Sequence, residues 1–333
     1  MRLKKILWFS LVALAIAASV GATFLIITKE SPVALANFTA AWTEKEPEET
    51  ISMIFTGDIM LGRYIAVLRE QNGGDFPFTH MPEILDTAKT SLQVDEIDLV
   101  VGNIEGPISS SNYVNPGTAM RFNFKPEVAE LLDKVGFTTL SMANNHTLDQ
   151  GSDAYQETYN LLTAQGIHAY GHADIADGPY TFTKHEFATK TIGFLGFNDA
   201  VFPLDEATAL AKIAETAPKV DFLIVSVHWG VEYEKTARAS ITELAHQFVD
   251  AGANFIHGHH PHVIQNAELY KGAPIYYSLG NFTFDQYWSP ATQEGLVVGL
   301  KLEGDEISTT ELIVDLVNKG EPKPRIVAPV LPN

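Results

Sequence analysis

The chain has 333 residues, a formal net charge of −19 at pH 7 and no cysteine. So acidic a balance argues against nucleic acid as a partner, because phosphate binding requires a basic surface. It would also repel any other polyanion, unless bound metal or local Arg and Lys reversed the sign near the site. The missing cysteine excludes thiolate metal sites, cysteine nucleophiles and disulfides.

The N-terminus predicts a membrane anchor. Three basic residues lie within the first five, and residues 6–27 then carry no charge, a stretch long enough to cross a bilayer core of about 30 Å as a helix. The positive-inside rule places the basic end in the cytoplasm and the rest of the chain outside. We therefore predict a cytoplasmic N-terminus and transmembrane helix over residues 1–28, in a single-pass protein of the cell membrane with an extracellular C-terminal domain. A cleaved signal peptide ending near Ala34-Leu35-Ala36 is the alternative.

Three further segments follow the anchor. Residues 29–50 end in the charged run Glu44-Lys45-Glu46-Pro47-Glu48-Glu49 and predict a solvated linker. Residues 51–317 are long enough for one large α/β domain. Residues 318–333 are rich in proline and predict an extended tail on the surface.

Within residues 51–317, short apolar runs alternate with helical patterns, which is typical of stacked βα units around a buried sheet. The predicted strands are Ile51–Thr56, Leu99–Gly102, Thr138–Ala143, Thr191–Phe197, Phe222–Val227, Asn254–His257 and Ile275–Ser278. The predicted helices are Lys125–Val135, Ala154–Gln165, Asp205–Ala217 and Ser240–Ala251.

Most of these strands end in a polar cluster. The clusters are Gly57-Asp58, Gly102-Asn103-Ile104-Glu105, Ala143-Asn144-Asn145-His146, His228-Trp229-Gly230, Gly258-His259-His260-Pro261-His262 and Ser278-Leu279-Gly280-Asn281. In open α/β sheets, the carboxyl ends of the strands form the crevice where ligands bind. We therefore expect these side chains, distant in sequence, to lie close together.

The histidine-rich segment after the sixth strand indicates a metal site. Pro261 favours an extended conformation at His260, so His260 and His262 are expected to point to one side while His259 faces away. A histidine-rich surface loop is the alternative for this segment considered alone.

The other strand-end clusters favour the metal site. The candidate ligands are Asp58, Glu105, Asn145, His228, His260 and His262. Carboxylate, amide and imidazole groups together suit Mn, Fe or Zn better than Ca or Mg. Six candidates exceed the needs of one tetrahedral site, so one or two ions are expected. Taken singly, the two acidic residues would more often be helix caps or surface groups.

These clusters, in this order, resemble the motifs of the CapA family, which is associated with poly-γ-glutamate capsule synthesis and has a fold similar to calcineurin-like metallophosphoesterases. The further residues that carry the resemblance are Ile59-Met60-Leu61-Gly62-Arg63 and Val231-Glu232-Tyr233. The resemblance implies an α/β fold, with a metallophosphoesterase-like layered β-sandwich flanked by helices. It also implies that the six candidate ligands bind metal. Two positions depart from the template, since Met60 stands in place of a histidine and Glu105 in place of an aspartate.

For catalysis, the resemblance implies that His146 protonates the leaving group and that Arg63 holds an anionic substrate oxygen. The alternatives are a hydrogen bond from His146 that orients Asn145 or a carboxylate, and a surface ion pair for Arg63. The aromatic residues Trp229, Tyr233, Phe282 and Trp288 are expected either in the core or in the wall of a cleft.

Two functions are therefore expected. The first is an exported, membrane-anchored metal-dependent hydrolase, of phosphoesterase type, in poly-γ-glutamate capsule synthesis or export. The second is a capsule-assembly component without catalysis that binds the polymer or its membrane-embedded synthase subunits. An anionic cell-envelope polymer is the expected partner in both.

Overall fold

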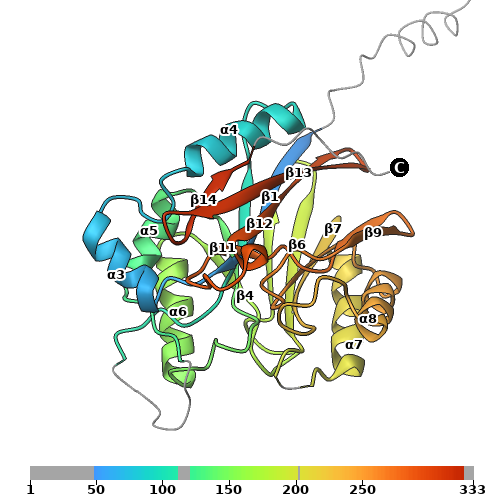
Figure 1. Cartoon of the computed structure of the whole chain (residues 1–333). Coiled ribbons are helices and arrows are strands. Elements are labelled where there is room, and N and C mark those ends of the chain that lie inside the picture. Colours follow the sequence, from blue (N-terminus) through green and yellow to red (C-terminus); the bar gives the residue numbers. More distant parts are fainter. Residues whose placement is uncertain (1–48, 112–120, 202, 326–333) are drawn as a thin grey trace, which may run out of the picture. The chain divides into compact units, whose positions relative to one another are not determined.

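The computed structural model describes residues 49–111, 121–201 and 203–325 (Figure 1). The predicted anchor and all but the last two residues of the predicted linker lie outside the described residues. In the three described ranges, no helix is both long enough and apolar enough to cross a bilayer.

The described chain forms two β-sheets. The first is eight-stranded, with the order β14-β13-β12-β1-β2-β3-β4 and with β11 paired to β1; the second is six-stranded, with the order β5-β6-β7-β8-β10-β9. The strands of the first sheet are β1 (Thr50–Ile59), β2 (Leu99–Ile104), β3 (Thr139–Ser141), β4 (His168–Tyr170), β11 (Asn281–Thr283), β12 (Glu294–Glu303), β13 (Glu306–Val317) and β14 (Glu321–Pro324). Those of the second are β5 (Phe182–Glu186), β6 (Thr191–Asn198), β7 (Phe222–His228), β8 (Phe255–His259), β9 (Ala267–Tyr270) and β10 (Ala273–Tyr276).

Helices cover the outer faces of both sheets (Figure 1). The helices are α3 (Arg63–Asn72), α4 (Met81–Leu92), α5 (Val128–Lys134), α6 (Ser152–Ala164), α7 (Glu206–Thr216) and α8 (Ala239–Asp250), with short 3₁₀ turns η1 (Ala217–Lys219) and η2 (Pro290–Gln293). Apolar residues of α3 to α6 share a buried cluster with the first sheet. Those of α7 and α8 share another with the second sheet.

A third apolar cluster lies between the two sheets. It forms because successive side chains of a strand point to opposite faces. In β1, Ile51, Met53 and Phe55 belong to this inner cluster, whereas Ile54 belongs to the cluster under the helices. Both faces of the strand are therefore buried, and the predicted mixed α/β fold with layered sheets is confirmed.

The predicted strands and helices match β1, β2, β3, β6, β7, β8 and β10, and α5 to α8. The long antiparallel strands β12 and β13 were not predicted. β12 pairs directly with β1, and β13 pairs with β12. The predicted domain boundary at residue 317 is wrong, because β14 lies in the predicted tail and pairs with β13. Glu321 of β14 is buried, so this part of the tail belongs to the sheet rather than to the surface.

One contact between the sheets is sensitive to acid. The rings of His168 in β4 and His185 in β5 stack with centroids 3.9 Å apart, and His185 Nε2 lies 2.8 Å from Thr139 Oγ1. Burial, followed by the neighbouring His168, lowers the pKa of His185 to about 4. An unfolded histidine has a pKa of about 6.5. Between these two values the unfolded chain binds more protons, so stability is present above about pH 6.5 and is lost as the pH falls toward 4.

We expect His185→Gln to reduce this loss, because glutamine retains a polar group near Thr139 but does not titrate. The free energy of unfolding in urea, measured at pH 7 and at pH 4.5, should differ by about 2 kcal/mol less in the variant than in the natural chain. Equal differences in the two proteins would contradict a half-buried His185 that is neutral in the folded protein at pH 7.

Candidate metal centre

The strand ends bring the predicted ligands together. Asp58 is the penultimate residue of β1, Glu105 follows β2 and Asn145 follows β3, three strands of the first sheet. His228 ends β7, and His260 and His262 follow β8, in the second sheet. Because β1, β2 and β3 are parallel, as are β7 and β8, the carboxyl ends of each set lie at one edge.

Asp58 is fully buried and accepts several polar contacts. Its Oδ1 accepts a hydrogen bond from Asn103 Nδ2 at 2.9 Å and lies 2.9 Å from His259 Nδ1, and its Oδ2 lies 3.2 Å from His262 Nδ1. Burial acts to raise the pKa of Asp58, but the contacts with His259 and His262 outweigh it and hold this pKa well below its usual value. The carboxylate is therefore ionised and held in place.

Glu105 is in the opposite situation. It is also fully buried, yet neither carboxylate oxygen has a hydrogen-bond partner. The nearest basic atoms are His262 Nε2 at 3.6 Å and His146 Nε2 at 3.9 Å from Oε1. Burial raises the pKa of Glu105 well above its usual value. A buried carboxylate without a partner is costly, which indicates that the site is built for a positive group.

His262 lies between the two carboxylates. Its Nδ1 is 3.1 Å from Asn281 Oδ1 as well as close to Asp58, and its Nε2 faces Glu105. Burial acts to lower the pKa of His262, but Glu105 and Asp58 outweigh it and raise this pKa to about 9. A cation bound to the ring would displace its extra proton.

His228 and Asn145 meet at the edge of the same cluster. His228 Nε2 lies 2.8 Å from Asn145 Oδ1, and its ring centroid is 4.9 Å from that of His260. Burial, followed by His260, holds the pKa of His228 well below its usual value, so the imidazole is neutral. Neutral imidazole is the form that binds metal. The structure thus brings all six predicted ligands into one region.

The predicted geometry of the histidine segment is wrong in two respects. His260 and His262 have φ angles of 94° and 56°, so the chain turns here rather than staying extended. His259 does not face away, since its Nδ1 approaches Asp58. Tertiary contacts override the local preference, because the His260 backbone N–H donates to Asp58 Oδ2 at 3.3 Å. His259 was therefore not predicted as a residue of the site.

Two asparagines that were not chosen as ligands connect the strand ends. Asn144 Nδ2 donates to Asn103 Oδ1 at 3.0 Å and to the Ile104 carbonyl at 2.8 Å, and Asn103 in turn donates to Asp58. Both lie in the predicted polar clusters, but only tertiary structure shows that they position a carboxylate instead of facing a cation.

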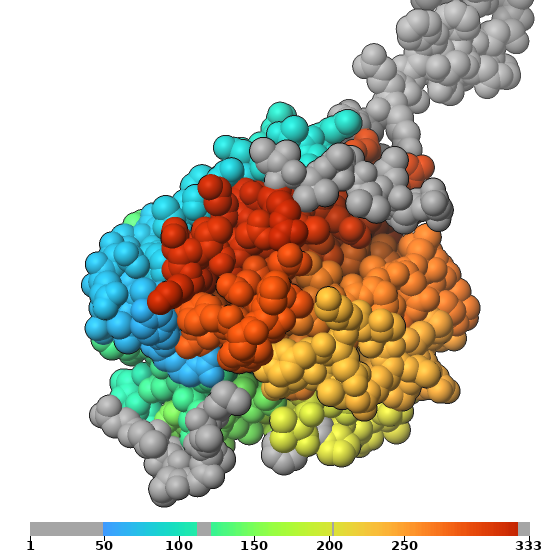
Figure 2. Space-filling view, in the orientation of Figure 1, coloured from blue at the N-terminus to red at the C-terminus, as the bar shows by residue number. Residues whose placement is uncertain are grey.

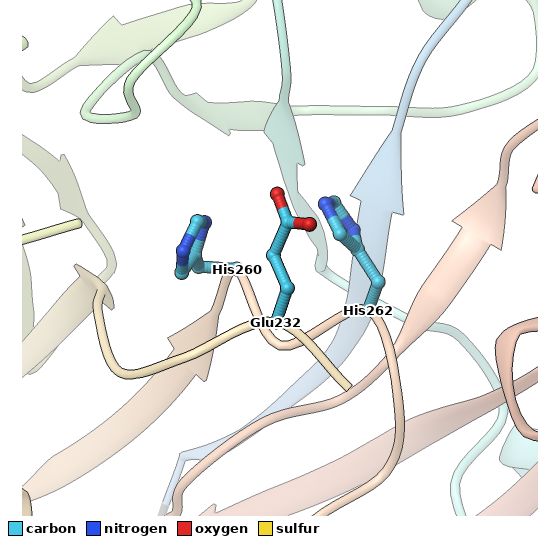
Figure 3. Close-up of side chains that lie close together, drawn as sticks. All are labelled: Glu232, His260 and His262. Carbon is cyan, nitrogen blue, oxygen red and sulfur yellow. The ribbon is translucent and has the colours of Figure 1, made fainter. Parts of the chain in front are cut away.

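Glu232 is a further residue that was not predicted as a ligand. It follows β7, and its carboxylate lies between the rings of His260 and His262 (Figure 3). One ligand atom from each of these residues lies within 4.8 Å of the others, as is also true of Asp58, Glu105 and His262. The two groups share His262.

His146 is held by a neighbouring acid. Its Nδ1 lies 2.8 Å from Asp149 Oδ2, and its ring stacks on Phe122 with centroids 4.0 Å apart. The other nitrogen, Nε2, is the one directed at Glu105. This arrangement presents one ring nitrogen to the centre.

Arg63 forms an ion pair with Asp285 and lies over the ring of Phe122, with 5.0 Å from its guanidinium carbon to the ring centroid. The two residues are 222 positions apart in the sequence. They meet because α3 adjoins the segment after β11, on the face shown in Figure 2. Arg63 therefore stands near His146, which also stacks on Phe122. The ion pair corresponds to the alternative stated for this residue, and none of these contacts tests the predicted catalytic role.

The four candidate aromatic residues divide by burial. Trp229 and Phe282 are fully buried and belong to the core, whereas Tyr233 and Trp288 are 41% and 61% exposed. The exposed pair makes an edge-to-face contact with ring centroids 5.8 Å apart, and the Tyr233 ring lies 6.3 Å from that of His262. These two residues therefore flank the centre at the surface.

Met60 departs from the template in structure as well as in sequence. Its side chain is fully buried in the apolar cluster beneath the helices, and its sulfur accepts a contact from the Gly62 N–H at 3.2 Å. The first motif therefore supplies one ligand candidate, Asp58, in place of the template's two.

The donor set fits a divalent cation. The two groups combine carboxylates with imidazoles, and Glu105 has no other partner. His260 Nδ1 is likewise buried without a partner. Mixed oxygen and nitrogen donors suit Mn, Fe or Zn. The buried cluster could therefore hold a metal ion.

The fold matches those of solved proteins. A hypothetical protein from Thermus thermophilus aligns with a TM-score of 0.50 at 18% identity, over 80% of this chain and 99% of that chain. A novel phosphatase from Mycoplasma pneumoniae aligns with a TM-score of 0.50 at 14% identity, over 80% and 95%. Fold and site thus define a two-sheet α/β protein of phosphoesterase-like architecture with a candidate metal centre.

The sequence comparisons identify the family. Residues 52–286 match the family described as bacterial capsule synthesis protein PGA_cap, and the chain belongs to it. It is 32% identical to the PGA biosynthesis protein CapA of Bacillus subtilis, over 75% of this chain and 67% of that protein. It is 29% identical to the capsule biosynthesis protein CapA of Bacillus anthracis, over 83% and 70%. The resemblance stated from the motifs is confirmed.

Proposed function

We propose that this protein is an exported, membrane-anchored component of poly-γ-glutamate capsule synthesis or export with a metal-dependent hydrolase site. The capsule role follows the family and the two named relatives. The hydrolytic role is supported above all by Glu105, a fully buried carboxylate that has no hydrogen-bond partner and faces two histidines. The substrate class is a phosphoester, or an amide or ester bond of a cell-envelope polymer.

Each residue then has a distinct task. Asp58, Glu105 and His262 would hold the cation, assisted by His228 and Asn145 at the adjoining edge. A bound divalent metal supplies activation of water and stabilisation of charge on the substrate oxygens. His146, oriented through Asp149, holds a proton at Nε2 for the leaving group. Arg63 attracts an anionic substrate, although Asp285 neutralises part of its charge.

The second candidate is a capsule-assembly component without turnover that binds the polymer or its membrane-embedded synthase. The burial of Met60 in the apolar core favours it, because the first motif then offers fewer ligands than the hydrolase template. The two candidates can be distinguished by a measurement of turnover. Only the hydrolase cleaves a substrate, and it needs the cation to do so.

The test compares the purified full chain with Glu105→Gln, which keeps the shape of the side chain but removes its charge. Metal content is measured by elemental analysis, and turnover is assayed on a generic phosphoester and on poly-γ-glutamate. We expect the variant to lose at least about tenfold in both metal affinity and turnover, since a direct ligand should matter at least as much as the residues behind it.

Glu268→Gln is the matched control. Glu268 is a half-buried carboxylate that contacts His246 and Tyr277 on the edge of the second sheet. This control should retain both properties. Metal binding without turnover on any substrate would favour the assembly role, and absence of bound metal in the natural chain would exclude the proposed hydrolase.

A further inference from the structure

A row of buried polar side chains leads from the centre into the layer between the two sheets. On the inner face of β8, the apolar Phe255 is followed at every second residue by His257 and His259, and all three are fully buried. The neighbouring strand repeats this pattern. In β7, Ile224 belongs to the apolar cluster between the sheets, and Ser226, two residues later, pairs with His257 in the register of the two strands. Polar groups therefore lie where apolar ones would be expected.

The two histidines of this row connect to a predicted metal ligand. His259 Nδ1 lies 2.9 Å from Asp58 Oδ1, and His259 Nε2 lies 3.1 Å from His257 Nδ1. The ionised carboxylate of Asp58 only accepts, so Nδ1 of His259 carries a hydrogen. In a neutral His259 ring, Nε2 then accepts the N–H of His257. Because the contact with Asp58 by itself leaves His259 Nδ1 outside hydrogen-bond geometry, the orientation of this ring depends on His257.

The packing around His257 suits an apolar ring. Its ring lies against Phe55, with centroids 4.9 Å apart, and against Phe255, with centroids 6.1 Å apart. Its Nε2 atom is buried and has no hydrogen-bond partner among the described residues. Such an atom costs free energy that a phenylalanine in the same place would not. A polar ring is therefore present where an apolar one would be more stable, which indicates a role other than packing.

Two hydroxyl groups lie beyond His257, on the side away from the centre. Tyr170 of β4 and Ser226 are both buried, and neither hydroxyl has a hydrogen-bond partner in the part of the chain that the structure describes. Burial raises the pKa of Tyr170, and contact with Ser226 offsets part of this rise, so the two side chains adjoin. Since a hydroxyl hydrogen rotates freely, Ser226 offers a donor to its neighbour His257.

We infer that His257 is a positioning residue: it holds the ring of His259, and through it the carboxylate of Asp58, in the orientation that binds the cation. This inference rests on the proposed metal-dependent function and adds a residue that touches neither the cation nor the substrate. Asn103 donates to the same oxygen of Asp58 from the first sheet, whereas His259 approaches it from the second. Both sheets thereby fix one ligand.

Two substitutions separate this role from a packing role. His257→Asn keeps an N–H group, because its amide nitrogen is as many bonds from Cα as Nδ1 is, but it leaves a space among the aromatic rings. His257→Phe fills the space but has no donor. Zn²⁺ binding to the full chain is measured by titration calorimetry, and stability by urea unfolding with a chelator present.

We expect His257→Phe to weaken Zn²⁺ binding at least about tenfold, as for other residues that orient metal ligands, and His257→Asn to retain most of the affinity. The order should reverse in urea, where His257→Phe is the more stable variant. A residue that only packs would rank the two variants in the same order in both measurements. That result, or unchanged Zn²⁺ binding by His257→Phe, would overturn the inference.

His185→Phe is the control, because it makes the same change in another histidine, one that stacks on His168 and contacts Thr139 between the sheets. It should leave the Zn²⁺ affinity unchanged. An equal loss of affinity in His185→Phe and His257→Phe would overturn the inference, because the effect would then be a general one of the inter-sheet layer.

A double-mutant cycle separates the inference from the proposed function. Asp58→Asn, His257→Phe and the double variant are unfolded in urea with a chelator present. If His257 supports Asp58, Asp58→Asn destabilises the His257→Phe protein less than it destabilises the natural chain. Additive losses would overturn the positioning role. A natural chain that takes up no Zn²⁺ would count against the proposed function, and the cycle would still decide whether His257 positions Asp58.

Discussion

Asp58→Asn is expected to destabilise the metal-free protein by about 3–5 kcal/mol, the usual cost of removing one partner from a buried charged pair. The Asp58 carboxylate contacts His259 and His262 and accepts from Asn103, and these contacts keep its pKa low despite its burial. A carboxyl group whose pKa is lowered on folding stabilises the protein above its unfolded pKa, and this contribution is lost as the pH falls through the folded value.

Glu105→Gln, in contrast, is expected to stabilise the metal-free protein or to leave its free energy of unfolding unchanged. Its pKa is raised by burial, so the ionised form costs stability as the pH rises above the unfolded value. Glutamine removes this cost and breaks no hydrogen bond, because neither oxygen of Glu105 has a partner. It also removes the attraction to His262 Nε2, 3.6 Å away, which offsets part of the gain.

Both variants are compared by urea unfolding of the full chain at pH 7 with a chelator present. A loss in Glu105→Gln as large as that in Asp58→Asn would mean that Glu105 serves the fold, and the main support for a metal site would be gone. The expected contrast instead identifies Glu105 as a residue kept for binding at the expense of stability.

Gly258→Ala is expected to destabilise the protein by about 3 kcal/mol and to disturb the centre. A Cβ atom at this position would lie 2.0 Å from the Tyr277 carbonyl oxygen and 2.5 Å from Trp229 Nε1. These two atoms already share a hydrogen bond of 2.9 Å in the core. Backbone must therefore move, and His259 and His260 follow directly in the chain.

Gly272→Ala provides the comparison, because a Cβ atom there meets nothing within 4 Å and only the φ of 89° opposes it. It should cost about 1 kcal/mol. Urea unfolding and metal titration of both variants check the prediction. Similar losses in the two proteins would show that close packing at Gly258 is not required.

Local sequence patterns were sufficient to predict the parallel strands and the ligand types. Alternating or continuous apolar runs mark β1, β7 and β8 because their side chains must be buried on both faces. The residues after these strands were predicted to meet because parallel strands place their carboxyl ends at one edge. This reasoning needs no long-range information, and it brought Asp58, Glu105 and His262 together correctly.

Long-range contacts decided the rest. Arg63 pairs with Asp285, 222 residues away, and His260 takes a positive φ because its N–H reaches Asp58 across 202 residues. No local propensity encodes such contacts.

The amino-acid sequence alone was thus enough to predict which strands are buried and which chemical groups follow them, because burial is reflected in the spacing of apolar residues. Only the tertiary structure decided where each side chain points, which is why the approach of Glu232 to His260 and His262 and the inward turn of His259 were not foreseen. Loops fold against whatever the rest of the chain places beside them, so their side-chain directions depend on contacts between distant segments.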